Sequence, residues 1–177
     1  MDGIRKAVQA DIPRVAAIYD HILTEEEQGR AVIGWIRGVY PTEQTARDAL
    51  EADTLFVLER DGVIAAAAKI DRNQVPEYAD APWRYPDAPD DQVMVLHTLV
   101  VDPAFAGKGC GKRFVAFYEE HAQTWGCPYL RMDTNAKNTA ARRLYNRLGY
   151  WEAGIVPCNF NGISGVQLVC LEKKLER

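Results

Sequence analysis

Residues 93–113, with the sequence VMVLHTLVVDPAFAGKGCGKR, constrain the fold more than any other part of the chain. The first nine, Val93–Val101, are almost all apolar or β-branched, which predicts a buried strand. Asp102-Pro103 ends that strand because proline has no N–H group for the sheet ladder. Three alternating glycines follow, Gly107, Gly109 and Gly111, and an apolar stripe after them predicts a helix. This combination favours an anion site, because the amides of the first helical turn have no partner in the helix.

Two common phosphate-binding motifs do not fit the spacing of this turn. A Walker P-loop requires a glycine five residues before the Gly-Lys pair and Ser or Thr after it, where this chain has Ala106 and Arg113. A dinucleotide fingerprint requires G-x-G-x-x-G, and the glycines here follow G-x-G-x-G. A turn that binds nothing is disfavoured, because each glycine costs backbone entropy on folding. The pattern therefore predicts an anion site of another type.

The loop and a second segment resemble the signatures of a known family. Asp102-Pro103 followed by Gly107-Lys108-Gly109-Cys110-Gly111-Lys112 resembles the acyl-CoA-binding signature of the GCN5-related N-acetyltransferases (GNAT). The segment NTAARRLYNRLGY, from Asn138 to Tyr150, resembles the second signature of that family. One position departs from the pattern, since Ala106 stands where Arg or Gln usually opens the loop. Binding through main-chain amides should survive this change, with weaker contacts to the diphosphate.

The resemblance implies an α/β (α+β) fold with a mixed central sheet and the element order β-α-α-β-β-β-α-β-α-β-β. It also implies that the two central parallel strands splay apart, so that the pantetheine arm of acetyl-CoA enters the gap like an added strand. We expect one domain over residues 1–177. The cofactor-binding residues that it implies are Leu99, Val100, Val101, Ala106, Gly107, Lys108, Gly109, Cys110, Gly111, Lys112, Asn138 and Tyr145.

The resemblance assigns the catalytic acid to Tyr145, which lies seven positions after Asn138 and matches the family tyrosine. The phenol would protonate the departing thiolate. Helical spacing puts Tyr145 on the inward face of its helix, so a core tyrosine with a satisfied hydroxyl is the alternative.

Two residues are candidates for the base. The amine must lose a proton before it attacks, because only about one alkylamine in 2,500 is neutral at pH 7. His97 lies on the central strand, and an imidazole suits proton removal at neutral pH. Asp133 ends the next strand, at a position where some relatives carry a carboxylate. Purely structural roles for both, and a water chain in place of a base, are the alternatives.

Hydrophobic periodicity and turn residues place the other elements. Strands are predicted at Gly3–Ala7, Asp53–Arg60, Val63–Ile70, Val93–Val101, Tyr129–Thr134, Tyr150–Val156 and Val166–Leu171, and helices at Pro13–Leu23, Thr42–Ala52, Gly111–Thr124 and Asn138–Leu148. Asp61-Gly62 predicts a two-residue hairpin. Strict alternation would place Leu99 and Val101 on the face of Val93, and Val100 on the opposite face.

Residues 71–91 are predicted to form an irregular loop, because four prolines interrupt them. Six acids against two bases give this loop a charge of −4. We interpret it as a wall or lid of the acceptor site, or alternatively as a flap over a sheet edge. As a wall it favours a cationic acceptor, on which Trp83 or Tyr85 could stack. The acidic run Glu25–Arg30 is either a solvated helix end or a second contact to such an acceptor.

Composition limits the partners and the location. A net charge of −4 argues against nucleic acid, so the expected acceptor is an amine on a small molecule or a peptide. We expect a cytoplasmic protein without a membrane partner, because neither a membrane span nor a signal-peptide core is present in the sequence. Four scattered cysteines predict free thiols rather than a metal site. A homodimer, and a non-catalytic CoA sensor instead of an enzyme, remain open alternatives.

Overall fold

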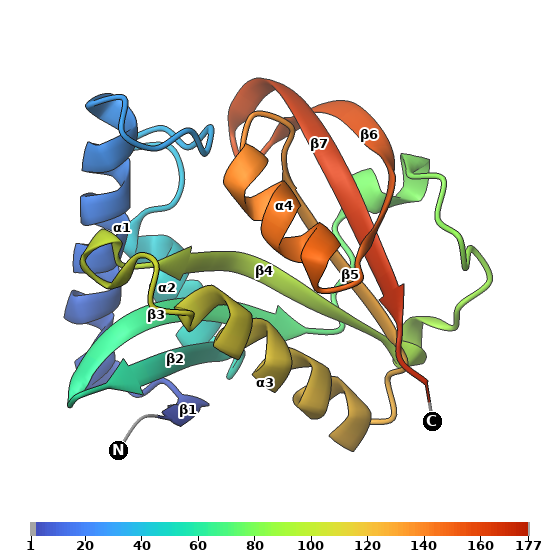
Figure 1. The fold of residues 1–177 in the computed structure, drawn as a ribbon, viewed down its shortest axis with the longest axis horizontal. Coiled ribbons are helices and arrows are strands. Elements are labelled where there is room, and N and C mark those ends of the chain that lie inside the picture. The colour runs from blue at the N-terminus through green and yellow to red at the C-terminus, as the bar shows by residue number, and fades with distance from the viewer. Residues whose placement is uncertain (1–2, 177) are drawn as a thin grey trace.

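A computed structural model describes residues 3–176, and its centre is a seven-stranded sheet with the order β1-β2-β3-β4-β5-β7-β6 (Figure 1). Neighbours β4 and β5 are parallel, and the other pairs are antiparallel. The strands are β1 (Gly3–Lys6), β2 (Leu55–Arg60), β3 (Val63–Asp71), β4 (Val93–Val101), β5 (Tyr129–Asn135), β6 (Trp151–Phe160) and β7 (Ile163–Lys174). The helices are α1 (Ile12–Glu27), α2 (Glu43–Glu51), α3 (Cys110–Thr124) and α4 (Thr139–Arg147). The predicted order of helices and strands is confirmed.

Helices cover both faces of the sheet. In Figure 1, α3 and α4 lie in front of it, and α1 and α2 lie on the other side. Phe114 of α3 packs with Met94 and Leu96 of β4 in one buried cluster. Val15 of α1 packs with Val100 in a second cluster. The core therefore has two apolar layers with the sheet between them. Of the helices within residues 3–176, none is long and apolar enough to cross a membrane.

The two parallel strands pair over only part of their length. Their register runs from Val93↔Tyr129 to Leu96↔Met132, after which β4 pairs with β3 and β5 pairs with β7. Figure 1 shows β4 and β5 diverging beyond this point. The predicted splaying is confirmed, and it leaves a gap at the carboxyl ends of both strands.

The strict alternation predicted along β4 is wrong beyond His97. Between two paired positions β4 carries one residue more than β3, which is a β-bulge. Thr98 takes up the bulge with a φ of 52°. As a result, Leu99 and Val101 pack toward the α3 side, whereas Val100 packs with the α1 side. The bulge begins where the pairing with β5 ends, so both features shape the same gap.

The last two strands are longer than predicted. They are joined by the two-residue turn Asn161-Gly162, whose residues have φ values of 53° and 79°. An Asn-Gly pair between strand-like segments is a strong hairpin signal, which the sequence analysis overlooked. The predicted turn at Asp61-Gly62 is confirmed by the pairing of Arg60 with Val63.

The acidic run after residue 24 is structural. Helix α1 continues to Glu27 rather than ending at Leu23. The carboxylate of Glu26 accepts the amides of Ile33 and Gly34 at 2.5 and 3.1 Å. This contact orders the connection between α1 and α2, and the predicted contact of the run with an acceptor is wrong, since none of its carboxylates lines the cleft described below.

Residues 72–92 form a flap that packs against the sheet. Tyr78 of this flap is 2% exposed and contacts side chains of β4, β6 and β7. Beneath it, Arg131 of β5 and Glu172 of β7 form a buried ion pair with an Nε–Oε2 distance of 3.1 Å. Arg131 also donates to the side-chain oxygen of Gln74 and to the carbonyl of Tyr85. The flap interpretation therefore describes most of this segment better than a wall or lid of the acceptor site, although Asn73 and Val75 at its start border the cleft described below.

Candidate active site

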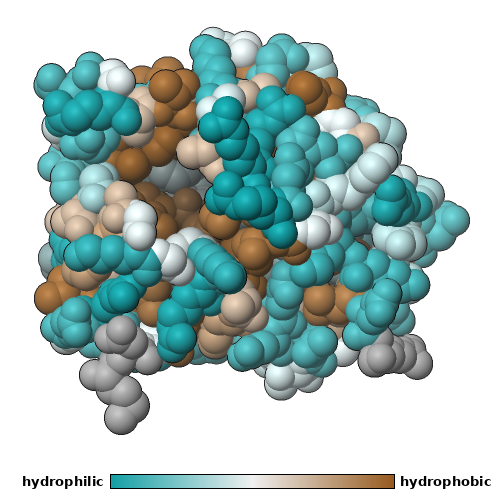
Figure 2. Space-filling view, viewed as in Figure 1, coloured by the Kyte–Doolittle hydropathy of each residue, from teal (hydrophilic) through white to brown (hydrophobic). Residues whose placement is uncertain are grey.

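A cleft of about 720 Å³ opens in the gap between β4 and β5. Figure 2 shows it as a hollow with hydrophobic side chains around it. Its walls come from α1, α2, α4, the ends of β4 and β5, and the turn between β6 and β7. The cleft brings together eight of the predicted site residues: His97, Leu99, Val100, Val101, Gly111, Asp133, Asn138 and Tyr145. The other predicted residues, 106–110 and 112, lie outside its lining, at the N-terminus of α3.

The glycine-rich loop at the start of α3 has backbone N–H groups that donate no hydrogen bond to the described part of the protein. Gly107 and Gly109 have φ values of 73° and 76°, and a Cβ atom at either would meet no atom within 4 Å. Within residues 3–176, the amides from Gly107 to Lys112 have no protein acceptor. Arg60 donates to the carbonyl of Lys108 at 2.6 Å, which holds the loop against the β2–β3 hairpin. Open amides on a helix of fifteen residues are suited to an anion.

Ala106 does not contribute an open amide. Its N–H donates to the carbonyl of Pro103 at 3.1 Å, within the short 3₁₀ turn Pro103–Phe105 that follows β4. The prediction that the amide of Ala106 is exposed is therefore wrong, and the open series begins at Gly107.

Tyr145 is buried, but its hydroxyl opens onto the cleft. Several buried tyrosines donate hydrogen bonds to protein groups, as Tyr118 does to the carbonyl of Met94 at 2.6 Å, whereas Tyr19, which also lines the cleft, has no such bond within residues 3–176. Tyr145 is 7% exposed and makes no hydrogen bond to another described residue. Its hydroxyl is not a sealed, orphaned atom either, so it reaches the open space of the cleft. Burial and the nearby charge of Asp133 raise the pKa of Tyr145, which keeps the phenol protonated.

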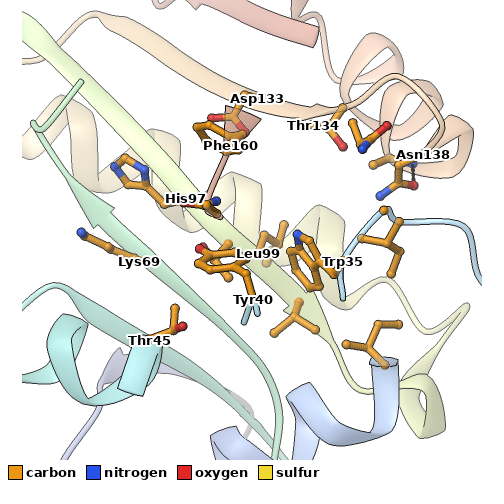
Figure 3. Close-up of a pocket in the computed structure, with 18 of the residues that line it drawn as sticks. Trp35, Tyr40, Thr45, Lys69, His97, Leu99, Asp133, Thr134, Asn138 and Phe160 are labelled. Atoms are coloured by element: carbon orange, nitrogen blue, oxygen red, sulfur yellow. Dashed lines mark hydrogen bonds between the residues drawn. The ribbon is translucent and has the colours of Figure 1, made fainter. Parts of the chain in front are cut away.

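Helix α4 begins at an N-cap formed by Asn138. The side-chain oxygen of Asn138 accepts the amide of Ala141 at 3.1 Å, and this hydrogen bond caps the helix. The same residue lines the cleft (Figure 3). Tyr145 follows two turns later on the side of α4 that faces the sheet.

Asp133 lies in the cleft and is the first residue of β5 beyond its pairing with β4. Its Oδ2 accepts a hydrogen bond from the hydroxyl of Tyr78 at 2.7 Å. Burial raises the pKa of Asp133 to about 6, against the opposing effects of Tyr78 and His97. A carboxylate with such a pKa is ionised at pH 7 and still basic enough to take a proton.

His97 lies beside Asp133 in the same cleft (Figure 3). Its Nε2 is 2.8 Å from Oδ1 of Asp71, on the neighbouring strand β3. Burial is the largest influence on the pKa of Asp71 and would raise it. The hydrogen bond and charge of His97, the amide of Asn73 and the charge of Lys69 together outweigh burial, so the pKa is lowered. Asp71 therefore stays charged and fixes the imidazole ring. Sequence reasoning placed Asp71 in the irregular loop and missed this contact, because the two residues are 26 positions apart and meet only through strand pairing.

The space around Asp133 and His97 is bounded mainly by apolar and aromatic side chains. Tyr40 and Trp35 reach into it from the connection before α2, and Phe160 reaches in from β6 (Figure 3). The charged side chains that line the cleft are Asp48, Lys69 and Asp133.

The predicted stacking of Trp83 or Tyr85 on an acceptor is wrong. The ring of Trp83 lies over the guanidinium of Arg131 at 4.3 Å, and Tyr85 packs against Tyr129. From the flap, Asn73 and Val75 line the cleft, and the acids of residues 77–91 do not. The local charge of −4 therefore does not face the acceptor space.

Comparison with known proteins decides the family. Residues 15–150 match the model of the Acetyltransferase (GNAT) family. The chain belongs to this family. The membership inferred from the two signatures is thereby confirmed, and the chain is an acetyltransferase. Among curated proteins, no sequence matches it.

Solved structures show the same GNAT fold at low sequence identity. A GNAT acetyltransferase from Streptococcus agalactiae superposes with a TM-score of 0.81 at 21% identity, covering 99% of this chain and 96% of the other. YncA from Salmonella typhimurium, solved with acetyl-CoA, gives 0.69 at 22% identity, covering 100% and 95%. The ribosomal-protein-S18-alanine N-acetyltransferase from Escherichia coli gives 0.69 at 19% identity, covering 100% and 96%. The predicted fold is confirmed over the whole length of these GNAT proteins.

Proposed function

We propose that this GNAT acetyltransferase transfers an acetyl group from acetyl-CoA directly to a primary amine. One observation carries the proposal. A single cleft extends from Gly111, beside the open amides of α3, to the hydroxyl of Tyr145, which has no hydrogen-bond partner among residues 3–176, and to the partly buried carboxylate of Asp133. The anion site therefore comes first, the gap between β4 and β5 follows, and the proton-transfer groups lie at its far end. This is the order in which the diphosphate, the pantetheine arm and the thioester follow one another in acetyl-CoA.

The residues present fit acetyl-CoA. The amides from Gly107 to Lys112 are open, and no Cβ atom blocks Gly107 or Gly109, so this loop would hold the diphosphate. The unpaired end of β4, Leu99 to Val101, would bind the pantetheine arm through its backbone. The neighbour solved with acetyl-CoA has the same fold, which adds support. When bound, acetyl-CoA supplies an activated acyl group as a thioester.

The protein groups then divide the proton transfers. Asp133 binds the ammonium of the acceptor and takes a proton from it. His97 stabilises the ionised carboxylate by electrostatic attraction. The amine lone pair forms the C–N bond, the C–S bond breaks, and Tyr145 gives or shares its proton with the leaving sulfur. The bonded nitrogen loses its second proton to water, the phenol of Tyr145 regains a proton from water, and Asp133 releases the first proton, so each turnover releases one proton to solvent.

The acceptor carries its amine on an apolar or aromatic body. Trp35, Tyr40 and Phe160 offer apolar surface next to Asp133. Asp48, the other carboxylate in the lining, already accepts from Gln44 at 2.7 Å. Lys69, the one Lys or Arg side chain among the lining residues, would repel a second ammonium, which favours monoamines over polyamines.

An acceptor screen tests the proposed function. The protein is incubated with acetyl-CoA and alkyl monoamines, aromatic monoamines, polyamines, amino acids or peptides. Free thiol is measured, and product mass is checked for one added acetyl group. Amine-dependent thiol release, greatest with apolar monoamines, is the expected result. No release with any amine class would contradict the proposal.

Substituting the loop glycine Gly109 by aspartate should weaken acetyl-CoA binding about 10- to 100-fold, because the new charge would face the diphosphate. Gly29→Asp is a matched control, since Gly29 has a φ of 74° against 76° for Gly109 and both positions are open. Calorimetry should show wild-type affinity for the control. A folded Gly109→Asp variant with wild-type affinity for acetyl-CoA would contradict the assignment of the loop.

A further inference from the structure

We propose that Tyr78, held by the flap over residues 72–92, is a positioning residue for Asp133. The inference rests on the proposed function, in which Asp133 is the base. It assigns the flap a role in the reaction although most of the flap lies outside the cleft. The hydroxyl of Tyr78 occupies Oδ2 of Asp133 and leaves Oδ1 for the acceptor.

The contact is short and protected. The distance from the Tyr78 hydroxyl to Oδ2 of Asp133 is 2.7 Å, and Tyr78 is 2% exposed. A phenol held on one carboxylate oxygen restricts the rotation of the carboxylate, and it stabilises the charged form by hydrogen bonding. The contact therefore sets both the direction and the basicity of Asp133.

Within the flap, Trp83 holds Tyr78 in place. The indole nitrogen of Trp83 donates to the carbonyl of Tyr78 at 2.8 Å, and the two rings meet edge to face at 5.1 Å. Trp83 in turn lies on Arg131, whose partner Glu172 accepts the amide of Arg84 at 2.8 Å. Breaking either partner of that buried pair would free the flap, so the ion pair supports the position of a phenol that is distant from it in sequence.

Several titratable groups face Asp133, and the test must separate Tyr78 from them. They are His97 from β4, Glu77 and Tyr78 from the flap, Tyr145 from α4, Tyr40 from the connection before α2, Cys158 from β6 and Cys170 from β7. Tyr78 is the one among them that donates a hydrogen bond to the carboxylate within residues 3–176. Its removal should therefore raise the pKa of Asp133 without changing the other neighbours.

A carbon-13 NMR titration of the Asp133 carboxyl in the free protein tests this directly. Tyr78→Phe should raise its midpoint by about one pH unit, a typical effect of one charge-assisted hydrogen bond. Tyr150→Phe is the matched control, because Tyr150 is also buried and donates to a carboxylate, Glu119, at 3.0 Å. The control should leave the Asp133 midpoint unchanged. An unchanged midpoint in Tyr78→Phe would overturn the proposal.

A gentler variant covers the case in which Tyr78→Phe does not fold. Replacing Tyr78 by 3-fluorotyrosine makes the phenol a stronger donor, so the Asp133 midpoint should move down instead of up. With an acceptor from the screen, the acid limb of kcat/KM should follow both shifts. If the variants are active but the midpoint of the acid limb stays at its wild-type pH in both, the role of Tyr78 is refuted and the proposed function is not. Absence of acetyl transfer in the wild type would refute the proposed function.

Discussion

Replacing Tyr145 by phenylalanine is expected to lower kcat by a factor of about 10²–10⁴, the usual range for a lost general acid. The physical reason is the leaving group, because a thiolate of CoA departs slowly when nothing protonates it. The ring stays in place, since Tyr145 is buried and contacts Tyr150 edge to face at 6.2 Å. Affinity for acetyl-CoA should therefore stay within about threefold of wild type.

Two measurements check this expectation. Steady-state thiol release gives kcat, and calorimetry gives the affinity for acetyl-CoA. Tyr118→Phe serves as a control, since Tyr118 is buried in the core and its hydroxyl bonds to backbone carbonyls outside the cleft. A Tyr145→Phe variant that keeps wild-type kcat would show that the phenol is only a core residue.

Changing Asp133 to asparagine should also reduce kcat/KM by about 10²–10⁴, because asparagine neither holds the ammonium by charge nor takes its proton. Asp48→Asn is the matched control, since Asp48 lines the same cleft and is bonded to Gln44. Its activity should stay close to wild type. Equal losses in the two variants would contradict the assignment of the base.

The pKa of Asp133 predicts the pH dependence of the wild type. Since burial raises this pKa to about 6, kcat/KM should fall below pH 6 as the carboxylate is protonated. The sign for stability is opposite. A carboxyl whose pKa is higher in the folded state favours folding at low pH, and that contribution is lost as the pH rises through 6. Asp133→Asn should therefore be no less stable at pH 7 than the wild type, as thermal unfolding would show.

Local signals predicted most of the fold. The strand Val93–Val101, the turn Asp61-Gly62 and the helix that follows Asn138 depend on neighbouring residues, and each is in place. The bulge at Thr98 was not predictable, because the pattern of apolar residues along a strand does not show where one strand has an extra residue relative to its neighbour. The longer β6 and β7 were predictable from Asn161-Gly162, so that error came from an overlooked turn.

The residues of the candidate site also fall into two groups, those that a sequence motif predicts and those that only the folded chain brings to the site. The loop glycines, Asn138 and Tyr145 carry motif signals, and the structure places them around one cleft or at its end. Asp71 and Tyr78 carry none, since their contacts depend on strand register and on how an irregular segment packs. The acidic loop misled the sequence analysis because its net charge says nothing about which way the side chains face.

Calorimetric titration of the purified, folded protein with acetyl-CoA tests the central claim most directly. One site per chain is predicted, with affinity in roughly the micromolar range and a negative heat-capacity change from the buried arm. The Gly109→Asp variant should bind more weakly under the same conditions. No heat at two temperatures, with the protein folded throughout, would contradict the whole account.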